Sequence, residues 1–284
     1  MRIDNKAWIT IYEKDFSPDK YIYHYTTFDS AIIILNSMSL RFSNICKAND
    51  TAESKPKLVF QKNVTEDDKE RIVDFFINVN TLGLKILCFT RDNITDTLLE
   101  KDLQKMYADY SGRGFSLPRM WAQYAENNSG ICLVFDKAKF LTLVDRQIKL
   151  LVIKKDNVNY IDQFKGYKVK REIVDNILNY LYSERSNVGN TIIGRQLFNK
   201  FPQLVNYNYF NKLDDWKGEH EYRILAINDK DIFVNHIEDS LNGIVIGERI
   251  PAEKERIIKM FCQDLIQIKK ISFTNNGCKL ENVN

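Results

Sequence analysis

The chain is poor in proline and glycine, and it contains no long apolar run. Five prolines and eleven glycines among 284 residues exclude a collagen-like or low-complexity chain. With 44% hydrophobic and 12% aromatic residues, the chain can bury a large core, so we expect a globular protein. No stretch approaches the roughly 20 apolar residues that a membrane-spanning helix needs. We therefore expect no membrane partner.

Histidine and cysteine are also scarce, and neither shows the spacing of a metal site. The three histidines include no HExxH motif, and the cysteines lack a CxxC pair and are odd in number. Reduced thiols are therefore expected, and neither a zinc site nor any other metal is predicted. The first residues, 1–6, lack the apolar core of a secretion signal, so the cytoplasm is the expected location. The cysteines are Cys46, Cys88, Cys132, Cys262 and Cys278.

The net charge is too small to indicate a partner by itself. Lys and Arg total 41 against 38 for Asp and Glu, which gives a formal charge of +3. Nucleic-acid binding would therefore need a local basic surface. One such cluster is formed by Lys165, Lys168, Lys170 and Arg171. It is typical of a solvated helix face, and its alternative function is to attract a polyanion.

The order of predicted elements indicates an α+β fold. Residues 21–26 are rich in β-forming residues, residues 29–37 have a helical pattern, and residues 84–90 form an apolar strand. Strands and helices then mix without the regular alternation of a doubly wound parallel fold. We predict a single globular domain over residues 1–284, with a core at about 21–273 and a helical insertion at about 165–211. A central, mostly antiparallel sheet with flanking helices is expected.

The most informative stretch is residues 216–223, with the sequence Trp-Lys-Gly-Glu-His-Glu-Tyr-Arg. If this stretch is extended, Glu219, Glu221 and Arg223 share one face, because side chains alternate along a strand. Three charges would then gather behind Trp216, which we assign to packing together with Trp121. The alternative is an ordinary solvated strand face, on which ion pairs contribute little to stability.

Several short blocks together resemble a bacterial family of unknown function, from about Tyr21 to Phe273. Where that family tends to have Phe-Asn-Asp-Pro, this chain has Ala48-Asn49-Asp50-Thr51, which lacks the rigid proline. The family in turn looks like a distant relative of the ADP-ribosyltransferase fold, so the sheet is expected to be split. The blocks are His24-Tyr25-Thr26, Asn49-Asp50 with Glu53, Cys88-Phe89-Thr90, Trp121-x-x-Tyr124-Ala125 with Gly130-Ile131-Cys132, and Lys212 with Trp216-x-x-Glu219-x-Glu221-x-Arg223.

The resemblance implies that NAD is a substrate and assigns roles to particular residues. Glu221 would stabilise the oxocarbenium-like centre formed when the nicotinamide–ribose bond breaks. Glu219 would handle the acceptor, and His24 would hold the ribose. These three are the predicted catalytic residues, and His24 and Glu221 are expected to line one cleft from nearby strands of one sheet. The predicted NAD-binding residues are His24, Tyr25, Thr26, Arg41, Tyr124 and Arg223, with Arg41 or Arg223 on the pyrophosphate and Tyr25 or Tyr124 stacked on nicotinamide.

Two classes of function follow from these observations. The first is an NAD-consuming enzyme that transfers ADP-ribose to a macromolecular acceptor or hydrolyses NAD, as a toxin or antiphage effector would. The second is a non-catalytic module on the same fold that binds nucleic acid or a protein through the region from Lys165 to Arg171. The joint presence of His24 and the pair Glu219 and Glu221 favours the first class.

Overall fold

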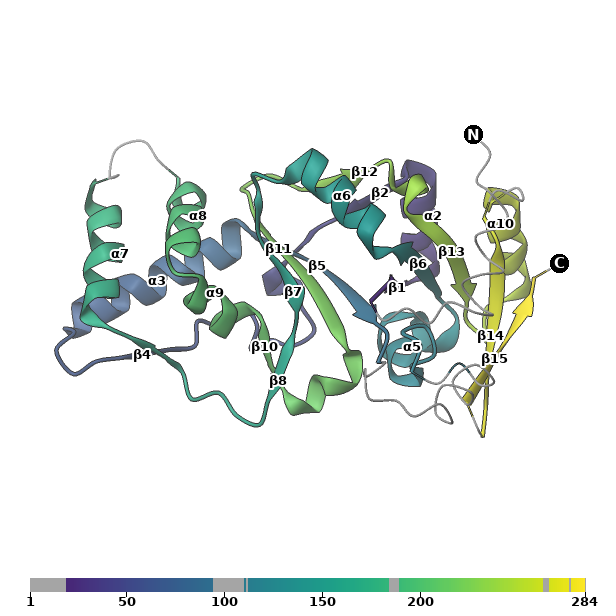
Figure 1. Ribbon diagram of the computed structural model, residues 1–284, viewed down its shortest axis with the longest axis horizontal. Coiled ribbons are helices and arrows are strands. Elements are labelled where there is room, and N and C mark those ends of the chain that lie inside the picture. The colour runs from purple at the N-terminus through teal and green to yellow at the C-terminus, as the bar shows by residue number, and fades with distance from the viewer. Residues whose placement is uncertain are drawn as a thin grey trace.

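The computed structural model describes residues 19–93, 110, 112–183, 189–262, 266–275 and 277–283. Strands and helices are mixed around one large sheet (Figure 1). The predicted α+β class is therefore confirmed. The sheet itself is mixed, because seven of its strand pairs run antiparallel and one pair, β13 and β14, runs parallel.

Nine strands of the described chain form the large sheet. The short strand β3 (Ser43–Asn44) pairs with β5 outside the main order. From one edge to the other, the remaining strands are β15 (Gly277–Asn282), β14 (Ile268–Thr274), β13 (Leu241–Ile246), β6 (Ile131–Asp136), β1 (Tyr21–Thr26), β5 (Leu84–Arg91), β11 (Glu221–Ile227) and β7 (Val152–Asn157).

Three small two-stranded sheets decorate the large one. They join segments that are far apart in the sequence. The sheet of β4 and β9, for example, brings residues near position 60 beside residues near position 168. The pairs are β2 (Ser39–Arg41) with β12 (Phe233–Asn235), β8 (Asn159–Ile161) with β10 (Asn211–Leu213), and β4 (Leu58–Phe60) with β9 (Tyr167–Val169).

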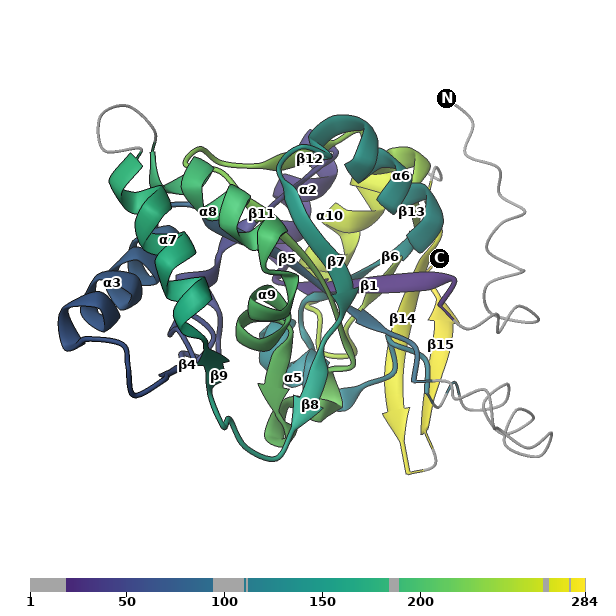
Figure 2. The same ribbon diagram turned by 60° about the vertical axis from the view of Figure 1, so that its left-hand side comes forward.

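The helices fall into two groups, one on the left of Figure 1 and the other among the strands at its centre and right (Figures 1 and 2). Short helices η1 (Ile45–Lys47), η2 (Glu126–Asn128), η3 (Asp214–Glu219) and η4 (Ile237–Asp239) connect other elements. One group holds α3 (Glu66–Leu82), α7 (Arg171–Ser183), α8 (Asn190–Lys200) and α9 (Pro202–Tyr209), and the other holds α2 (Phe28–Ser37), α5 (Pro118–Tyr124), α6 (Lys137–Ile148) and α10 (Ala252–Cys262).

Local sequence explains where these helices begin. The side chains of Thr27, Thr65 and Asp136 accept backbone hydrogen bonds at the starts of α2, α3 and α6, which satisfies donors that a helix leaves unpaired. The helical pattern of residues 165–210 predicts two helices, and the described residues of this region form three, α7, α8 and α9. Pro202 explains the extra boundary, because proline is favoured at the first turn of a helix and interrupts a helix that reaches it.

Strand β11 separates two hydrophobic cores. Tyr222, Ile224 and Ala226 face the core shared with α2, α5, α6 and α10. Leu225 and Ile227 face the core formed with α3, α7 and α8. All seven residues of β11 are buried. Because side chains alternate along a strand, Glu221 and Arg223 lie on the same face as Leu225 and Ile227, at the margin of the helical core.

The sheet opens into a fork between β1 and β5. These strands pair only where Ile22 meets Arg91 and Tyr23 meets Thr90, whereas β1 pairs with β6 along all six of its residues. Beyond Tyr23, β1 stays with β6, and β5 stays with β11. The two halves of the sheet therefore diverge from one point of contact.

No helix in the described parts of the chain combines the length and apolar character that crossing a membrane requires.

The two described tryptophans of the predicted motifs differ in burial. Trp121 is fully buried, packs edge-on against Tyr25 at 5.2 Å between ring centroids, and donates from Nε1 to the Phe115 carbonyl at 2.8 Å. Trp216 is half-buried between the cations of Arg119 and Lys212. Trp121 therefore fits the packing role predicted for both, while Trp216 borders charged groups.

We expect Trp121→Ala to lower the free energy of unfolding by about 3–5 kcal/mol. The substitution leaves a buried cavity in the core and removes the hydrogen-bond donor of the Phe115 carbonyl. Trp216→Ala should cost less than half as much, because its ring already contacts solvent. Urea unfolding of both variants measures the difference. Equal losses would mean that the Trp216 ring carries core packing that its exposure does not reveal.

Candidate functional site

A cavity of about 720 Å³ lies at the fork between β1 and β5. Its walls come from β1, α2 and β2 on one side and from β5, β10 and β11 on the other, with α5 and η3 beside them. The volume is in the range of sites that hold a nucleotide-sized ligand. Residues from the predicted site that line the cavity are His24, Tyr25, Thr26, Arg41, Tyr124, Glu219, Glu221 and Arg223.

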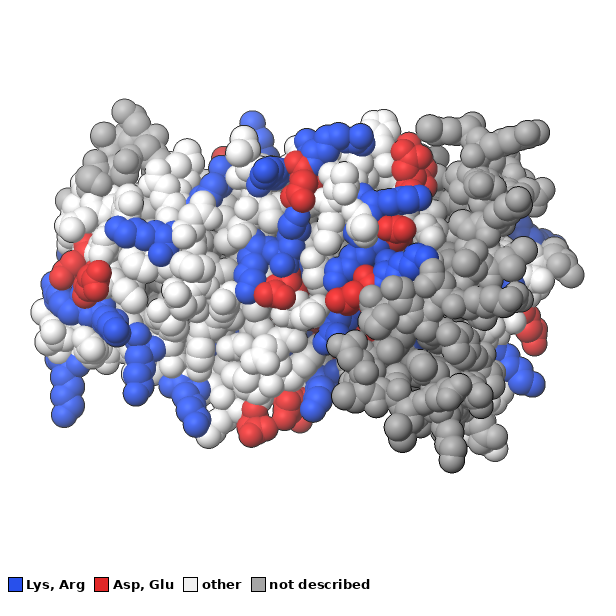
Figure 3. All heavy atoms as spheres, viewed as in Figure 1, with Lys and Arg blue, Asp and Glu red and all other residues white. Residues whose placement is uncertain are grey.

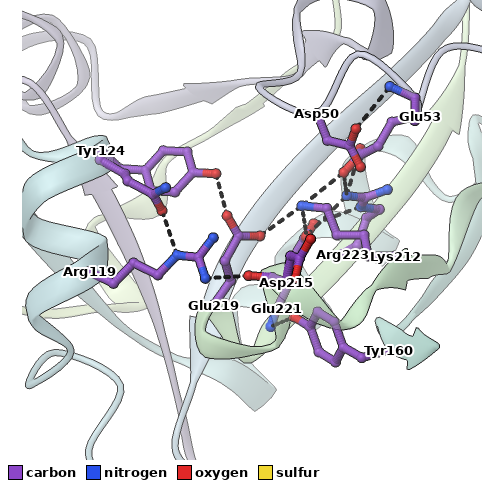
Figure 4. A network of polar contacts seen from close by, with 12 residues as sticks. Asp50, Glu53, Arg119, Tyr124, Tyr160, Lys212, Asp215, Glu219, Glu221 and Arg223 are labelled. Atoms are coloured by element: carbon purple, nitrogen blue, oxygen red, sulfur yellow. Dashed lines mark hydrogen bonds and ion pairs between the residues drawn. The ribbon is translucent and has the colours of Figure 1, made fainter. Parts of the chain in front are cut away.

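Five buried charged residues meet at one end of this cavity, and we call them the charge cluster (Figure 4). Its members come from four separate segments: the turn after η1, strand β10, helix η3 and strand β11. None is more than 4% exposed. Burying charges is expensive unless they are paired, so their pairing decides whether this arrangement is stable. The members are Glu53, Lys212, Glu219, Glu221 and Arg223.

Lys212 contacts all three carboxylates of the cluster. Its Nζ lies 2.8 Å from Glu53, 2.7 Å from Glu219 and 3.0 Å from Glu221. Its ammonium group donates hydrogen bonds to Glu219 and Glu221 and forms an ion pair with Glu53. Lys212 thus fixes the positions of three chain segments relative to one another.

Arg223 completes the cluster through its planar guanidinium. Nε and Nη2 donate to the two oxygens of Glu221 at 2.7 and 3.0 Å. Nη2 also donates to Glu53 at 2.9 Å, and Nη1 donates to the Tyr209 carbonyl at 2.8 Å. The fork-like contact with Glu221 is the strong bidentate geometry of arginine and carboxylate. Every nitrogen of Arg223 is therefore already engaged.

The cluster shifts the pKa values of its members strongly. Burial alone would raise the pKa of Glu221, but Arg223 and Lys212 outweigh burial and hold this pKa at about 2. Burial would likewise lower the pKa of Lys212, yet Glu221, Glu53 and Glu219 raise it above its usual value. Both groups are therefore ionised at neutral pH. The cluster thus brings three carboxylate side chains together with two cationic ones.

Tyr124 connects α5 to the cluster. Its hydroxyl donates to Glu219 at 2.5 Å, and burial together with the charge of Glu219 raises the pKa of Tyr124, so the phenol stays protonated. Nearby, Arg119 donates to the Asp215 carbonyl and lies over the Trp216 ring. These contacts hold α5 against η3 (Figure 4). The prediction that Tyr25 or Tyr124 stacks on a ligand stays a prediction, and the Tyr124 hydroxyl orients a carboxylate.

One part of the strand prediction is wrong. Glu219 does not lie on β11, because it is the last residue of η3, and His220 follows in the left-handed conformation with φ of 45°. The strand begins only at Glu221. The expected meeting of Glu219, Glu221 and Arg223 still occurs. It arises because Lys212 draws Glu219 in from the preceding turn, and strand alternation places only Glu221 and Arg223.

His24 and Glu221 both line the cavity, but their side chains start from opposite faces of the sheet, which departs from the predicted arrangement of two neighbouring strands presenting them together. Tyr23, Thr90 and Glu221 lie in one row across β1, β5 and β11 and so share a face. His24 follows Tyr23 and takes the other face, where its ring packs edge-on against Phe89 at 5.7 Å. The cavity reaches both residues because it passes through the fork.

The hydrogen bonding of His24 defines its chemistry. Nδ1 lies 3.2 Å from the Cys88 carbonyl, and since a carbonyl only accepts, this nitrogen carries the hydrogen. Burial lowers the pKa of His24, so the ring is neutral at pH 7. Nε2 is then a hydrogen-bond acceptor on the cavity wall. A neutral imidazole of this kind suits a ligand hydroxyl better than a phosphate.

The other predicted ligand-binding residues are placed differently. Tyr25 is buried, and its hydroxyl donates to the Gly114 carbonyl at 2.7 Å, so its ring is part of the wall. Thr26 is buried at the cavity edge. Arg41 is exposed on the rim. Because the nitrogens of Arg223 are held within the charge cluster, Arg41 is the arginine of the predicted pair that can meet a phosphate.

The sequence prediction misses Glu53 and Lys212 as members of the site. Both stand in the blocks that carry the family resemblance, but Asn49, Asp50 and Glu53 are typical of a simple turn. The turn does form, with Glu53 donating its N–H to the Asp50 carbonyl at 3.0 Å. Its side chain nevertheless contacts Arg223, which is 170 residues away in the sequence. A buried arginine and lysine beside three carboxylates cannot be inferred from spacing alone.

Comparison with known families supports the first part of the predicted resemblance. Residues 120–224 match a family described as a protein of unknown function, DUF2971. This segment contains Tyr124, Lys212, Glu219, Glu221 and Arg223, so four of the five cluster members lie inside it. No curated protein and no solved structure matches the chain.

We expect Lys212→Met to lower the free energy of unfolding by about 3–5 kcal/mol, because it leaves three buried carboxylates facing Arg223 alone. The matched control is Lys155→Met, which removes a partly exposed ion pair with Asp145 and should cost less than about 1 kcal/mol. Urea unfolding at neutral pH gives both values. Similar, small losses would contradict the stabilising role assigned to Lys212.

Acid should weaken the fold through Glu221. Its pKa is lower in the folded state, at about 2, than the ordinary value of about 4.3, so its contribution is complete above the ordinary value. It is lost as the pH falls toward 2, and amounts to about 3 kcal/mol. The difference in unfolding free energy between the wild type and Glu221→Gln should therefore narrow between pH 5 and pH 2. A difference that stays constant would contradict the lowered pKa of Glu221.

Proposed function

We propose that the protein binds NAD in the fork cavity and cleaves its nicotinamide–ribose bond, passing ADP-ribose to a macromolecular acceptor or to water. The observation that carries this proposal is the charge cluster, which places three carboxylates and two cations at the cavity wall. The ordered sequence blocks and the forked sheet support it. The family match leaves the activity open, because that family has no described function.

The charge balance of the cluster suits a cationic transition state. When the glycosidic bond breaks, its electron pair leaves with the nicotinamide nitrogen, and positive charge develops on the ribose ring. Carboxylates held at the cavity wall would stabilise that charge, and preorganised electrostatic stabilisation of this kind often lowers a reaction barrier more than any other effect. Stability alone does not account for the cluster, since buried ion pairs are often no better than apolar packing.

Glu221 and Glu219 receive different roles in this proposal. Glu221 is held by Arg223 and Lys212 in one orientation and contributes a fixed negative charge. Glu219 is bound by Lys212 and by the neutral Tyr124 hydroxyl, so its charge is the less fully compensated. We assign to Glu219 the proton released when water or an acceptor group attacks the ribose carbon.

The remaining walls can orient the rest of the substrate. Nε2 of His24 is placed to accept a hydrogen bond from a ribose hydroxyl. Arg41 and Lys47 stand exposed on the rim, where they can meet the pyrophosphate. Phosphates at the rim and ribose near the fork would direct nicotinamide toward the charge cluster. Holding the substrate in this way lowers the entropic part of the barrier.

The test is nicotinamide release from NAD by the purified protein. Glu221→Gln should reduce release by a factor on the order of hundreds or more, because it removes a principal charge. Glu219→Gln and Tyr124→Phe should depress transfer to an acceptor more than hydrolysis. Asp92→Asn is the matched control, because Asp92 also forms a buried ion pair, with Arg113 at 3.1 Å, away from the cavity. It should retain release despite any loss of stability.

Equal and small effects of all three cavity variants would overturn the proposal. So would complete absence of nicotinamide release from folded wild-type protein in the presence of macromolecular acceptors. Thermal unfolding of every variant shows whether a loss of activity reflects a loss of fold.

A further inference from the structure

A second charged feature lies away from the fork cavity, where β4 pairs in parallel with β9. The pairing aligns Leu58 with Tyr167, Val59 with Lys168 and Phe60 with Val169. It places residues 55–62, with the sequence KPKLVFQK, beside residues 165–170, with the sequence KGYKVK. We call these two segments together the lysine ribbon. The sequence indicates only the second half of it.

The lysine ribbon concentrates positive charge that the rest of the chain lacks. Its 14 residues contain six lysines and no aspartate or glutamate. The whole chain has a formal charge of +3, so the remaining residues together carry a charge of −3. The basic character is therefore local. Figure 3 shows Lys and Arg side chains projecting along the lower left edge, over β4 and the segment between β8 and β9.

Strand alternation turns the lysines outward. Lys168 and Lys170 are exposed, while Val169 between them is buried in the helical core. Lys168 lies on β9 and Lys170 follows the last residue of that strand, so the two exposed lysines stand close together along the chain. Lys57 is the exception, because its Nζ donates to the Asn208 carbonyl at 2.9 Å. The exposed lysines are Lys55, Lys62, Lys165, Lys168 and Lys170.

These five lysines are not neutralised within the described chain, where none of them forms an ion pair. Arg171, which follows them, behaves differently. It pairs with Asp68 at 3.1 Å and with Asp175 at 2.8 Å. Of the basic cluster seen in the sequence, the three lysines therefore remain available, and the arginine stabilises α7. Exposed cations without intramolecular partners attract polyanions.

We propose that the lysine ribbon binds nucleic acid through its phosphates, without reading the bases. Phe60 and Tyr167 are partly buried, on the opposite side of the strands from the exposed lysines, so no ring is presented for stacking on a base. A membrane surface fits less well, because Val59 is the exposed large apolar side chain on the ribbon, and surface binding to lipid uses a wider apolar face. The inference does not depend on the activity proposed for the fork cavity.

The test is fluorescence anisotropy with a short labelled duplex at increasing salt and without NAD. With about four phosphate contacts, the logarithm of affinity should fall with the logarithm of salt with a slope of about −3 to −4. The double variant Lys168→Glu with Lys170→Glu should lower affinity at least tenfold and flatten that slope by about 2. The charge-matched control replaces the exposed Lys149 and Lys279 by glutamate and should bind nearly as the wild type does.

Three outcomes would overturn this inference. They are no binding of duplex or single strands at low salt, equal losses in the ribbon and control variants, and tighter binding to anionic vesicles than to nucleic acid. Lys168 and Lys170 do not line the fork cavity, so the ribbon variant should release nicotinamide from NAD as the wild type does. This measurement therefore tests the ribbon separately from the fork cavity. Duplexes of unrelated sequence should bind equally well, and strong preference for one sequence would contradict recognition through phosphates alone.

Discussion

The three ion pairs of Lys212 are the interaction on which the candidate site depends. A single ammonium group joins Glu53 from the turn after η1, Glu219 from η3 and Glu221 from β11. A buried ammonium among three carboxylates is stabilised by all of them, whereas loss of any partner weakens the compensation of the buried charges. The positions of the three carboxylates in the cavity wall are thus fixed by several ion pairs at once. Such rigidity is what a preorganised electrostatic site requires.

The fork in the sheet gives this cluster access to a ligand. If β1 and β5 paired along their full length, no gap would open between them. The cavity beside Glu221 and Arg223 could then not extend through the sheet. Instead the register of β1 with β5 ends after Tyr23 and Thr90, and beyond that point β5 pairs with β11 and, at Lys85 and Ile86, with the short strand β3. The same divergence exposes His24 from the opposite face. Backbone pairing therefore decides which charges meet the cavity, and side-chain pairing decides how they are held there.

Sequence reasoning predicts the helices and strands better than the long-range contacts between their side chains. The strand at Tyr21–Thr26, the helix that follows it, the α+β class and the alternation of Glu221 and Arg223 all follow from local pattern. Glu219 is misplaced by such reasoning because the left-handed His220 ends a helical turn that the charge pattern does not reveal. Glu53 is missed because its contact with Arg223 spans 170 residues. Long-range ion pairs leave no period in a sequence.

The two charged features of the molecule differ in how their charges are compensated, and this difference governs what each can bind. In the charge cluster the charges are buried, so they pair with one another, and three carboxylates share two cations. In the lysine ribbon, solvent shields the lysines, so five of them form no ion pair within the described chain and present a positive face. A buried, fixed charge can act on one atom of a bound ligand, whereas an exposed set of cations attracts an extended polyanion at a salt-dependent rate. If both proposals hold, the ribbon would bring the nucleic acid to the protein as the acceptor, and the cluster would act on NAD.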